Sequence, residues 1–327
     1  MSSTHHTVAF RCDASMRIGS GHVMRCLNLA DHMQARGWRC SFIVNKEALH
    51  VVPTLHTSSY DIFHDEDTLP GNFDLAIIDH YELDHHYEQS TRAWAKKVLV
   101  IDDIFRRKHA CDFLMNYATF SKADEDKHDI DDDCIAFFGL GYVILKKGFL
   151  DPPRPPENRP AKNVHLFFGA SDVINLTLRC LHYIVQKNLH AHTIFEIVIA
   201  DANPDKDAII QICENHDNLN LYIQVPDISI VIKRCDLAFG VGGVAMWERL
   251  ALGIPTVEFA HSEVQLESLH ALRNINALHY AGIGKEIDTF FDNGQFEAFI
   301  EAPPVLEKLQ IGHQLDEMIE TIEKKIS

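Results

Sequence analysis

A histidine follows a glycine turn at the point where the first apolar run of the chain gives way to an amphipathic segment. The turn reads RIGSGH and covers Arg17 to His22. Glycines let the backbone turn tightly and approach a ligand, and the N-terminus of the following helix favours anions. The same positive helix end disfavours a charged imidazole, and a neutral imidazole can accept a proton. His22 is therefore a candidate general base. The alternative is a plain turn in which Ser20 caps the helix.

A second glycine turn lies in the stretch DLAFGVGGVAMWERLALGIP, residues 236 to 255. An apolar run ends at Gly240, and a helical pattern begins near Gly243 and carries Glu248 further along. Backbone amides and the helix dipole could hold a diphosphate here, and the carboxylate could reach a ribose diol. The alternative is a turn whose glycines serve close packing, with Glu248 as an exposed helix acid.

Two further strand ends carry glycine or polar residues. The stretch FFGASD, residues 167 to 172, places Gly169 where it could face a ligand, and Ser171 or Asp172 could cap the following helix. Tyr81 in the stretch DHYELD follows another strand-like run, so it could face a ligand or lie on the surface. Ligands of parallel-sheet proteins bind at the carboxyl ends of the strands, which makes these positions the ones to test.

Short apolar runs alternate with longer amphipathic segments along the whole chain, a pattern typical of βαβ units and parallel sheets. In the first half, we expect strands at residues 7–12, 40–45, 74–79, 97–102, 113–116 and 134–139. In the second half, we expect them at 163–168, 195–200, 219–225, 236–241 and 256–260. The clearest helical pattern starts at His22 and is closed by Gly37.

A proline-rich stretch separates the two series of strands. DPPRPPENRP, residues 151–160, has five prolines in ten residues, and proline supplies no amide hydrogen to a helix or sheet. We therefore expect a Rossmann-like domain at 1–150, a linker at 151–160 and a second Rossmann-like domain at 161–327. This GT-B-like α/β arrangement predicts ligand binding in an interdomain cleft. The final amphipathic segment, residues 311–325, could pack back on the first domain.

Composition narrows the classes of partner. The formal net charge of −17 argues against binding to nucleic acid or anionic lipid. No run approaches the roughly 18 consecutive apolar residues of a membrane helix. The stretch MSSTHHTVAF has no signal-peptide pattern, so we expect a cytoplasmic protein without membrane insertion. We also expect a monomer.

Cysteine and histidine usage does not favour a metal site. The eight cysteines show no CxxC spacing, which indicates reduced thiols. The densest histidine cluster, DHYELDHHYE at residues 79–88, could bind a metal ion, but it reads as a solvated loop that opens a helix. We therefore expect no metal and no cofactor.

Several of these stretches together resemble a known family. The chain is similar to the UDP-sugar hydrolases of the pseudaminic acid pathway (PseG-type), relatives of GT-B glycosyltransferases such as the peptidoglycan enzyme MurG. The resemblance covers nearly the whole chain. It rests on FRCDASMRIGSGHVMRCLNLA, IIDHYELD, IDDIFRRKHACDFLMN, FFGLGYVIL, FFGASDVINLTL, ADANP and CDLAFGVGGVAMWERLALGIP.

The resemblance implies a role for individual residues. The catalytic histidine of the family falls on His22, and its sugar-side tyrosine falls on Tyr81. The other residues implied on the sugar side are Arg11, Asp13, Ser15 and Gly21, and Gln265 in the second domain is implied as a further substrate-binding residue. The residues implied on the uridine diphosphate side are Gly169, Ser171, Gly242, Gly243 and Glu248.

The chain departs from the family pattern at two places. Members commonly read GAGGST at the second glycine turn, whereas this chain has Val244 and Ala245 and so lacks one or two hydroxyl donors to phosphate. Members also commonly carry Asn-Gln after the following strand, where this chain reads Val264-Gln265.

The resemblance implies hydrolysis of UDP-2,4-diacetamido-2,4,6-trideoxy-β-L-altrose with inversion at the anomeric carbon. His22 would deprotonate the attacking water, and the amides of Gly242 and Gly243 would meet the charge of the leaving diphosphate, so neither an acid nor a metal ion is required. Two alternatives remain open. The first is a glycosyltransferase that uses the same donor. The second is a UDP-sugar-binding protein with reduced hydrolysis, which the departures at Val244, Ala245 and Val264 motivate.

Overall fold

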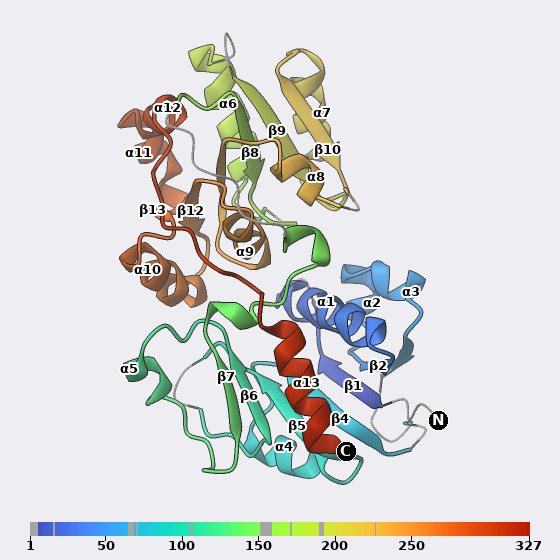
Figure 1. The fold of residues 1–327 in the computed structure, drawn as a ribbon. Helices are drawn as coiled ribbons and strands as arrows, with labels where there is room; N and C mark the ends of the chain where they lie inside the picture. The colour runs from blue at the N-terminus through green and yellow to red at the C-terminus, as the bar shows by residue number, and fades with distance from the viewer. Residues whose placement is uncertain are drawn as a thin grey trace. The chain divides into compact units, whose positions relative to one another are not determined.

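The chain forms two separate parallel sheets, each in its own compact unit. In the computed structural model, the described residues are 6–15, 17–64, 69, 71–104, 107–150, 159–170, 172–189, 193–225 and 227–327. The N-terminal unit comprises Met1–Lys146 and Ile311–Ser327, and the C-terminal unit comprises Lys147–Gln310. Most of the predicted linker, residues 151–158, lies outside the described residues. Figure 1 shows a sheet with flanking helices in each unit.

The N-terminal unit contains a seven-stranded sheet in the order β3-β2-β1-β4-β5-β6-β7, and all its strand pairs are parallel. The strands are β1 (Thr7–Cys12), β2 (Arg39–Ile43), β3 (Asp61–Phe63), β4 (Phe73–Asp79), β5 (Ala95–Ile101), β6 (Phe113–Asn116) and β7 (Ile135–Phe138). The helices are α1 (Gly21–Ala35), α2 (Ala48–Val51), α3 (Thr54–Thr57), α4 (His85–Thr91), α5 (Lys122–Glu125) and α13 (Leu315–Ile326), with a 3₁₀ turn, η2, at Leu140–Tyr142. The order reverses between β1 and β4, and the carboxyl ends of such strands form a binding crevice in open α/β sheets.

The C-terminal unit contains a six-stranded parallel sheet in the order β10-β9-β8-β11-β12-β13. Its strands are β8 (Asn163–Phe167), β9 (Ile194–Ile199), β10 (Leu219–Ile223), β11 (Leu237–Val241), β12 (Thr256–Ala260) and β13 (His279–Ile283). Its helices are α6 (Leu176–Lys187), α7 (Lys206–Glu214), α8 (Ser229–Ile232), α9 (Val244–Ala251), α10 (Leu266–Asn274), α11 (Ile287–Asp292) and α12 (Gln295–Glu301). The 3₁₀ turns are η3 (Lys147–Phe149), η4 (Glu263–Gln265) and η5 (Gly284–Glu286). Here the order reverses between β8 and β11.

Burial of apolar side chains explains both sheets. Strands such as β4 and β5 are nearly continuous apolar runs, as expected for parallel strands that are covered on both faces. Helix α6 buries Leu176, Cys180, Leu181 and Ile184, which recur at helical spacing. Full burial of one such aliphatic side chain contributes roughly 1.5–3 kcal/mol. The core of each unit therefore positions the strand ends that carry the candidate site.

The fold class predicted from the sequence is confirmed: both halves are parallel-sheet α/β structures. The alternation missed β3 and β13. Strand β3 has three residues, and β13 reads HYAGI, so neither shows a clear apolar run. All eight cysteines are free thiols, in agreement with the sequence. Among the described residues, no helix is both long and apolar enough to cross a membrane.

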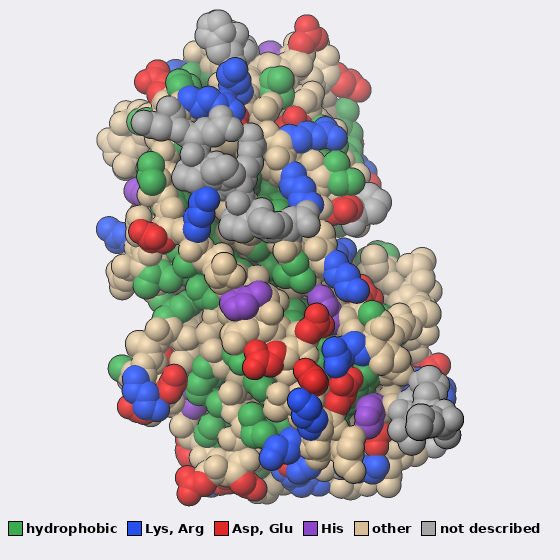
Figure 2. All heavy atoms as spheres, viewed as in Figure 1, with side chains coloured by type: hydrophobic (Ala, Val, Ile, Leu, Met, Phe, Trp, Pro, Cys, Tyr) green, Lys and Arg blue, Asp and Glu red, His purple; other side chains and the backbone are tan. Residues whose placement is uncertain are grey.

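Helix α13 corresponds to the final amphipathic segment of the sequence, and its residues belong to the N-terminal unit. Glu323 on α13 accepts hydrogen bonds from Arg36 Nη2 at 2.8 Å and from Trp38 Nε1 at 2.9 Å. The side of this unit seen in Figure 2 carries acidic and basic side chains interspersed with one another.

Candidate functional site

The turn before α1 is built by its own side chains. The chain leaves β1 at Cys12, and the Oγ atom of Ser15 accepts a hydrogen bond from the Ile18 amide at 3.0 Å. The Gly19 amide donates to the Ser15 carbonyl at 2.7 Å, and Gly19 has a φ of 85° that favours glycine. Ser20 makes no side-chain hydrogen bond to the helix, so the alternative in which Ser20 caps α1 is wrong. Ser15, predicted on the sugar side, shapes the turn.

His22 lies in the first turn of α1 and is buried, with 6% of its surface exposed. Its Nδ1 atom lies 2.5 Å from the Oδ1 atom of Asp79, the fully buried last residue of β4. Strands β1 and β4 pair in parallel, which brings the start of α1 and the end of β4 to the same sheet edge. The reversal of strand order thus joins a histidine and a carboxylate that are far apart in sequence.

Arg25, one turn after His22, holds the same carboxylate. Its Nη2 atom donates to Asp79 Oδ1 at 2.6 Å, and its Nε atom donates to Asp79 Oδ2. Burial by itself raises the pKa of Asp79, but Arg25 and His22 outweigh burial and hold that pKa well below its usual range. Asp79 is therefore ionised at neutral pH and only accepts hydrogen bonds. Nδ1 of His22 therefore carries a proton, and in the neutral form of the imidazole the lone pair lies on Nε2.

A second layer of side chains surrounds Arg25. Its Nη1 atom donates to the Tyr117 hydroxyl and, at 3.1 Å, to Asp103 Oδ2. The Tyr81 ring packs edge-on against His22 with 4.4 Å between ring centroids and 79° between planes. The Tyr81 hydroxyl points to Asp103 Oδ2 at 3.5 Å. Tyr81, predicted from its strand-end position, thus lies beside His22 and remains 37% exposed.

The sequence interpretation missed Arg25, Asp79, Asp103 and Tyr117. A signal existed for two of them. Asp79 ends an apolar strand two residues before Tyr81, and Arg25 follows His22 at the spacing of one helical turn. The sequence carries no comparable signal for Asp103 and Tyr117, because their contacts with Arg25 form only when the sheet is folded.

Arg11 and Asp13 lie together, but they bind each other. Arg11 Nη1 donates to Asp13 Oδ1 at 2.6 Å, His80 Nε2 lies 3.1 Å from Asp13 Oδ2, and the Asn45 amide donates to Oδ1 at 2.8 Å. Burial raises the pKa of Asp13, but the hydrogen bonds from His80 and Arg11 outweigh it and hold the pKa well below its usual range. Asp13 therefore organises the loops after β1 and β2.

The glycine turn of the C-terminal unit connects β11 to α9. Gly243 has a φ of 141°, a conformation that side-chain-bearing residues rarely adopt. A Cβ atom added to Gly242 would lie 3.3 Å from Gln265 and from Leu269, so this turn approaches the start of α10 closely. Gly169 follows the neighbouring strand β8. A Cβ atom added to Gly169 would lie 3.8 Å from the Val241 side chain, so Gly169 lies beside the turn.

The amide of Gly242 is not available to a phosphate, contrary to the prediction. It donates to the Phe259 carbonyl at 3.2 Å and so extends the sheet. The amides at the start of an α-helix have no acceptor within the helix, so the donors of this turn begin at Gly243 and continue into the first turn of α9. The backbone amides that could bind a phosphate therefore start one residue later than predicted, at Gly243 and not at Gly242.

Gln265 binds the backbone of the glycine turn. Its Nε2 atom donates to the Gly242 carbonyl at 2.5 Å, and its Oε1 atom accepts from the His261 amide at 3.0 Å. The predicted residues Gln265 and Gly242 thus meet. Both ends of the Gln265 side chain hold the turn in place.

Helix α9 turns two charged side chains inward. Glu248 is 9% exposed, so the alternative of an exposed helix acid is wrong. Arg249 is fully buried and pairs with Glu258 on β12 through Nε at 3.0 Å and Nη2 at 2.5 Å. A Cβ atom on Gly240 would lie 2.3 Å from Arg249 Nη2, so this glycine makes room for the guanidinium. Burial raises the pKa of Glu258 although Arg249 lowers it in part.

The loop after β8 leads into α6 through a capping carboxylate. Asp172 accepts hydrogen bonds from the amides of Leu176 and Thr177, both at 2.9 Å, which confirms the expected cap. Ser171, predicted on the nucleotide side, lies outside the described residues.

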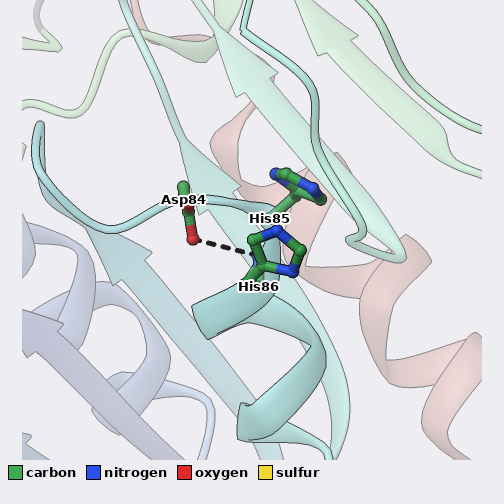
Figure 3. A group of neighbouring side chains, drawn as sticks. All are labelled: Asp84, His85 and His86. Atoms are coloured by element: carbon green, nitrogen blue, oxygen red, sulfur yellow. Dashed lines mark hydrogen bonds between the residues drawn. The ribbon is translucent and has the colours of Figure 1, made fainter.

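The histidine-rich stretch forms a helix start. Asp84 Oδ1 accepts from the His86 amide at 3.0 Å, which caps α4 (Figure 3). Single ligand atoms of Asp84, His85 and His86 lie within 4.8 Å of one another. The two rings are 4.0 Å apart with 36° between their planes.

The chain is similar in sequence to known proteins. No family model matches the sequence. The chain is 26% identical over 226 residues to the UDP-2,4-diacetamido-2,4,6-trideoxy-beta-L-altropyranose hydrolase of Campylobacter jejuni, covering 68% of this chain and 80% of that protein. It is 24% identical over 320 residues to an uncharacterized protein of Methanocaldococcus jannaschii, covering 90% of this chain and 65% of that relative's length.

Solved structures agree with the fold. The crystal structure of MurG from Acinetobacter baumannii matches with a TM-score of 0.58 at 13% identity and covers 97% of this chain and 99% of that chain. The chain therefore has two parallel-sheet α/β domains of the GT-B type, and its resemblance to the PseG-type hydrolases is confirmed by its similarity to the Campylobacter enzyme.

Proposed function

We propose that the protein hydrolyses UDP-2,4-diacetamido-2,4,6-trideoxy-β-L-altropyranose at the anomeric carbon and releases UDP and the free sugar for pseudaminic acid biosynthesis. The observation that carries the proposal is the buried His22–Asp79 pair at a strand end of the N-terminal unit. The relative in Campylobacter jejuni supports the sugar. We assign the sugar end of the substrate to the N-terminal unit and the nucleotide end to the C-terminal unit.

In the proposed reaction, Nε2 of His22 takes a proton from water as the water oxygen bonds to the anomeric carbon. The bond between that carbon and the UDP oxygen breaks, and its electron pair leaves with the diphosphate. Attack from the face opposite UDP inverts the configuration. The imidazolium that forms lies against the ionised carboxylate of Asp79, which stabilises it. Arg25 keeps Asp79 ionised, so the proton stays on His22.

On the nucleotide side, the growing charge of the diphosphate meets the free amides that begin at Gly243. Glu248 is proposed to bind the ribose, and Gly169 and Ser171 are proposed to line the same nucleotide site. Because UDP is a good leaving group whose charge is met by backbone donors, the proposed reaction uses no metal ion and no cofactor.

On the sugar side, Tyr81 and Gly21 are proposed to contact the substrate directly. A Cβ atom on Gly21 would meet no described atom within 4 Å, so the fold leaves space there for a ligand. Arg11, Asp13 and Ser15 are proposed to act through the shape of the loops that they hold.

Gln265, in the C-terminal unit, is proposed to act through the glycine turn, whose Gly242 carbonyl accepts a hydrogen bond from its side chain.

A proton NMR time course with the UDP-diacetamido sugar, without any acceptor, tests this function. Wild type is expected to release the free sugar first as the inverted anomer. The His22→Ala variant is expected to be slower by about 10²–10⁴-fold, because general base catalysis is lost. The His85→Ala variant, which changes an imidazole at the start of α4, serves as the matched control and is expected to be as fast as wild type.

The other outcomes assign the alternatives. Turnover that needs an added acceptor identifies a glycosyltransferase. Tight binding of UDP without turnover identifies a binding protein. Equal rates for wild type and His22→Ala overturn the role of the histidine.

A further inference from the structure

Two cysteines of the N-terminal unit lie in contact although the sequence separates them widely. The Sγ atoms of Cys111 and Cys134 are 3.7 Å apart. Cys111 precedes β6 and Cys134 precedes β7, and these strands pair in parallel. The Ile135 amide donates to the Asp112 carbonyl at 2.9 Å, so the backbone next to both thiols is already joined. A disulfide has an S–S length of about 2.05 Å, so bond formation would bring the two sulfur atoms closer together.

We propose that Cys111 and Cys134 are a reversible oxidation site that forms a disulfide with a low-molecular-weight disulfide as the oxidant. The proposal is independent of the hydrolase reaction. It concerns a cross-link between the starts of β6 and β7, beside the segment that carries His109.

The surroundings favour attack by Cys134. Its side chain is partly exposed, whereas Cys111 is 6% exposed. The hydrogen bond from Cys111 and the nearby charge of His109 lower the pKa of Cys134 against the effect of burial. The Nδ1 atom of His109 lies 2.8 Å from Glu88 and its Nε2 atom lies 3.0 Å from Asp102, and these carboxylates hold His109 in its cationic form. A partly exposed thiol with a lowered pKa next to a second thiol is the arrangement of a redox-sensitive pair.

The reaction balances as two thiol–disulfide exchanges. The Cys134 thiolate attacks one sulfur of the oxidant, forms a mixed disulfide and releases one thiol. Cys111 then attacks the Cys134 sulfur and releases the second thiol. The two cysteines lose two electrons and two protons, and the oxidant gains both. Reduction by a dithiol reverses the reaction.

Another cysteine pair provides an internal comparison. Burial, and then its neighbour Cys12, raises the pKa of Cys26. Both of these thiols are fully buried, so a disulfide reagent cannot reach them without unfolding. Contact alone therefore does not select a pair, and the partial exposure of Cys134 distinguishes the proposed site.

The test incubates the folded full chain with oxidised glutathione, alkylates the remaining thiols and identifies linked peptides by mass spectrometry. We expect the protein to lose the mass of two hydrogen atoms, one peptide pair to join Cys111 to Cys134, and dithiothreitol to restore both thiols. The Cys111→Ser variant is expected to retain glutathione on Cys134. The Cys134→Ser variant is expected to form no link, and Cys213→Ser, a cysteine of the C-terminal unit, is expected to form the link as wild type does.

Circular dichroism of each variant checks that it is folded. A folded wild type that forms no link overturns the proposal. A link between Cys12 and Cys26 in its place overturns it too, as does a Cys111→Ser variant that carries no glutathione.

Discussion

The two units place different chemistry at the same position in their sheets. In the N-terminal unit, the strand ends where the order reverses carry a network of charged side chains, with Asp79 between His22 and Arg25. In the C-terminal unit, the corresponding strand end carries a glycine turn, and the side chains Arg249 and Gln265 support it from within. We propose that the first arrangement serves proton transfer by side chains and the second serves anion binding by backbone amides.

Buried histidines in the two units differ in the direction of their pKa shifts. In the N-terminal unit, burial lowers the pKa of His109, but Asp102 and Glu88 outweigh burial and raise it to about 9. In the C-terminal unit, burial and then Arg249 lower the pKa of His165 to about 3. The first histidine is a buried cation and the second is a buried neutral ring. Two carboxylates overcome the effect of burial at His109, whereas burial itself, helped by Arg249, keeps His165 neutral.

The largest effect is expected for Asp79→Asn. The amide has one acceptor oxygen where the carboxylate has two, so Arg25 takes the oxygen and the NH₂ group turns to Nδ1 of His22. The lone pair then lies on Nδ1 and is lost from Nε2, and kcat is expected to fall by about 10³-fold. Arg25 also loses one of its two anionic partners and keeps Asp103, so Tm must be measured alongside kcat. Asp74→Asn, at the opposite end of β4, is the matched control. Full activity in folded Asp79→Asn would remove the distinction between the two strand ends.

Gly240→Ala tests the inward-facing side chains of the C-terminal unit. The added Cβ would lie 2.3 Å from Arg249 Nη2, and the guanidinium cannot move away without leaving Glu258 unpaired. We expect the free energy of unfolding in urea to fall by about 3 kcal/mol. An unchanged urea midpoint would show that Arg249 has another position available.

His109 predicts a pH-dependent stability of the N-terminal unit. Its pKa is raised from 6.5 to about 9 in the folded state, so the stabilisation is fully present below pH 6.5 and is lost as the pH rises through 9. The shift corresponds to about 3 kcal/mol at most, measured as unfolding free energy against pH. His109→Gln is expected to flatten the curve in that window, while His86→Gln, at the exposed start of α4, keeps it. An unchanged curve for His109→Gln would contradict the charged form.

The smallest effect is expected for Gly21→Ala, the counterpart of Gly240→Ala. No described atom lies within 4 Å of the added Cβ, so stability should stay within about 0.5 kcal/mol. The methyl group would occupy space proposed for the sugar, and kcat/KM is expected to fall about 10-fold, a loss of about 1.4 kcal/mol. Activity equal to wild type would place the sugar elsewhere.

The alternation of apolar and amphipathic segments was sufficient to predict two parallel sheets, because a buried strand must be apolar along its length. It failed for β3 and β13, which are short or interrupted by polar residues. The glycine turn was predicted, but its donors were not, because the Gly242 amide pairs with Phe259 on a strand that comes later in the chain. Likewise, the sequence does not indicate that the carboxylate of Asp13 binds Arg11, His80 and the Asn45 amide, because His80 and Asn45 come next to it only in the folded unit.

The sequence by itself determined which residues could do chemistry: a histidine at a helix start, glycines that permit a tight turn, and the motifs that resemble nucleotide-sugar hydrolases. Local geometry and backbone sterics are enough to interpret the histidine and the glycines, and the motifs are interpreted through their resemblance to the family. Only the tertiary structure decided how His22 is oriented, because Asp79 reaches it through strand pairing across the reversal of order. Only the tertiary structure placed Cys111 against Cys134 and Arg249 beneath Gly240, since long-range packing depends on which strands become neighbours.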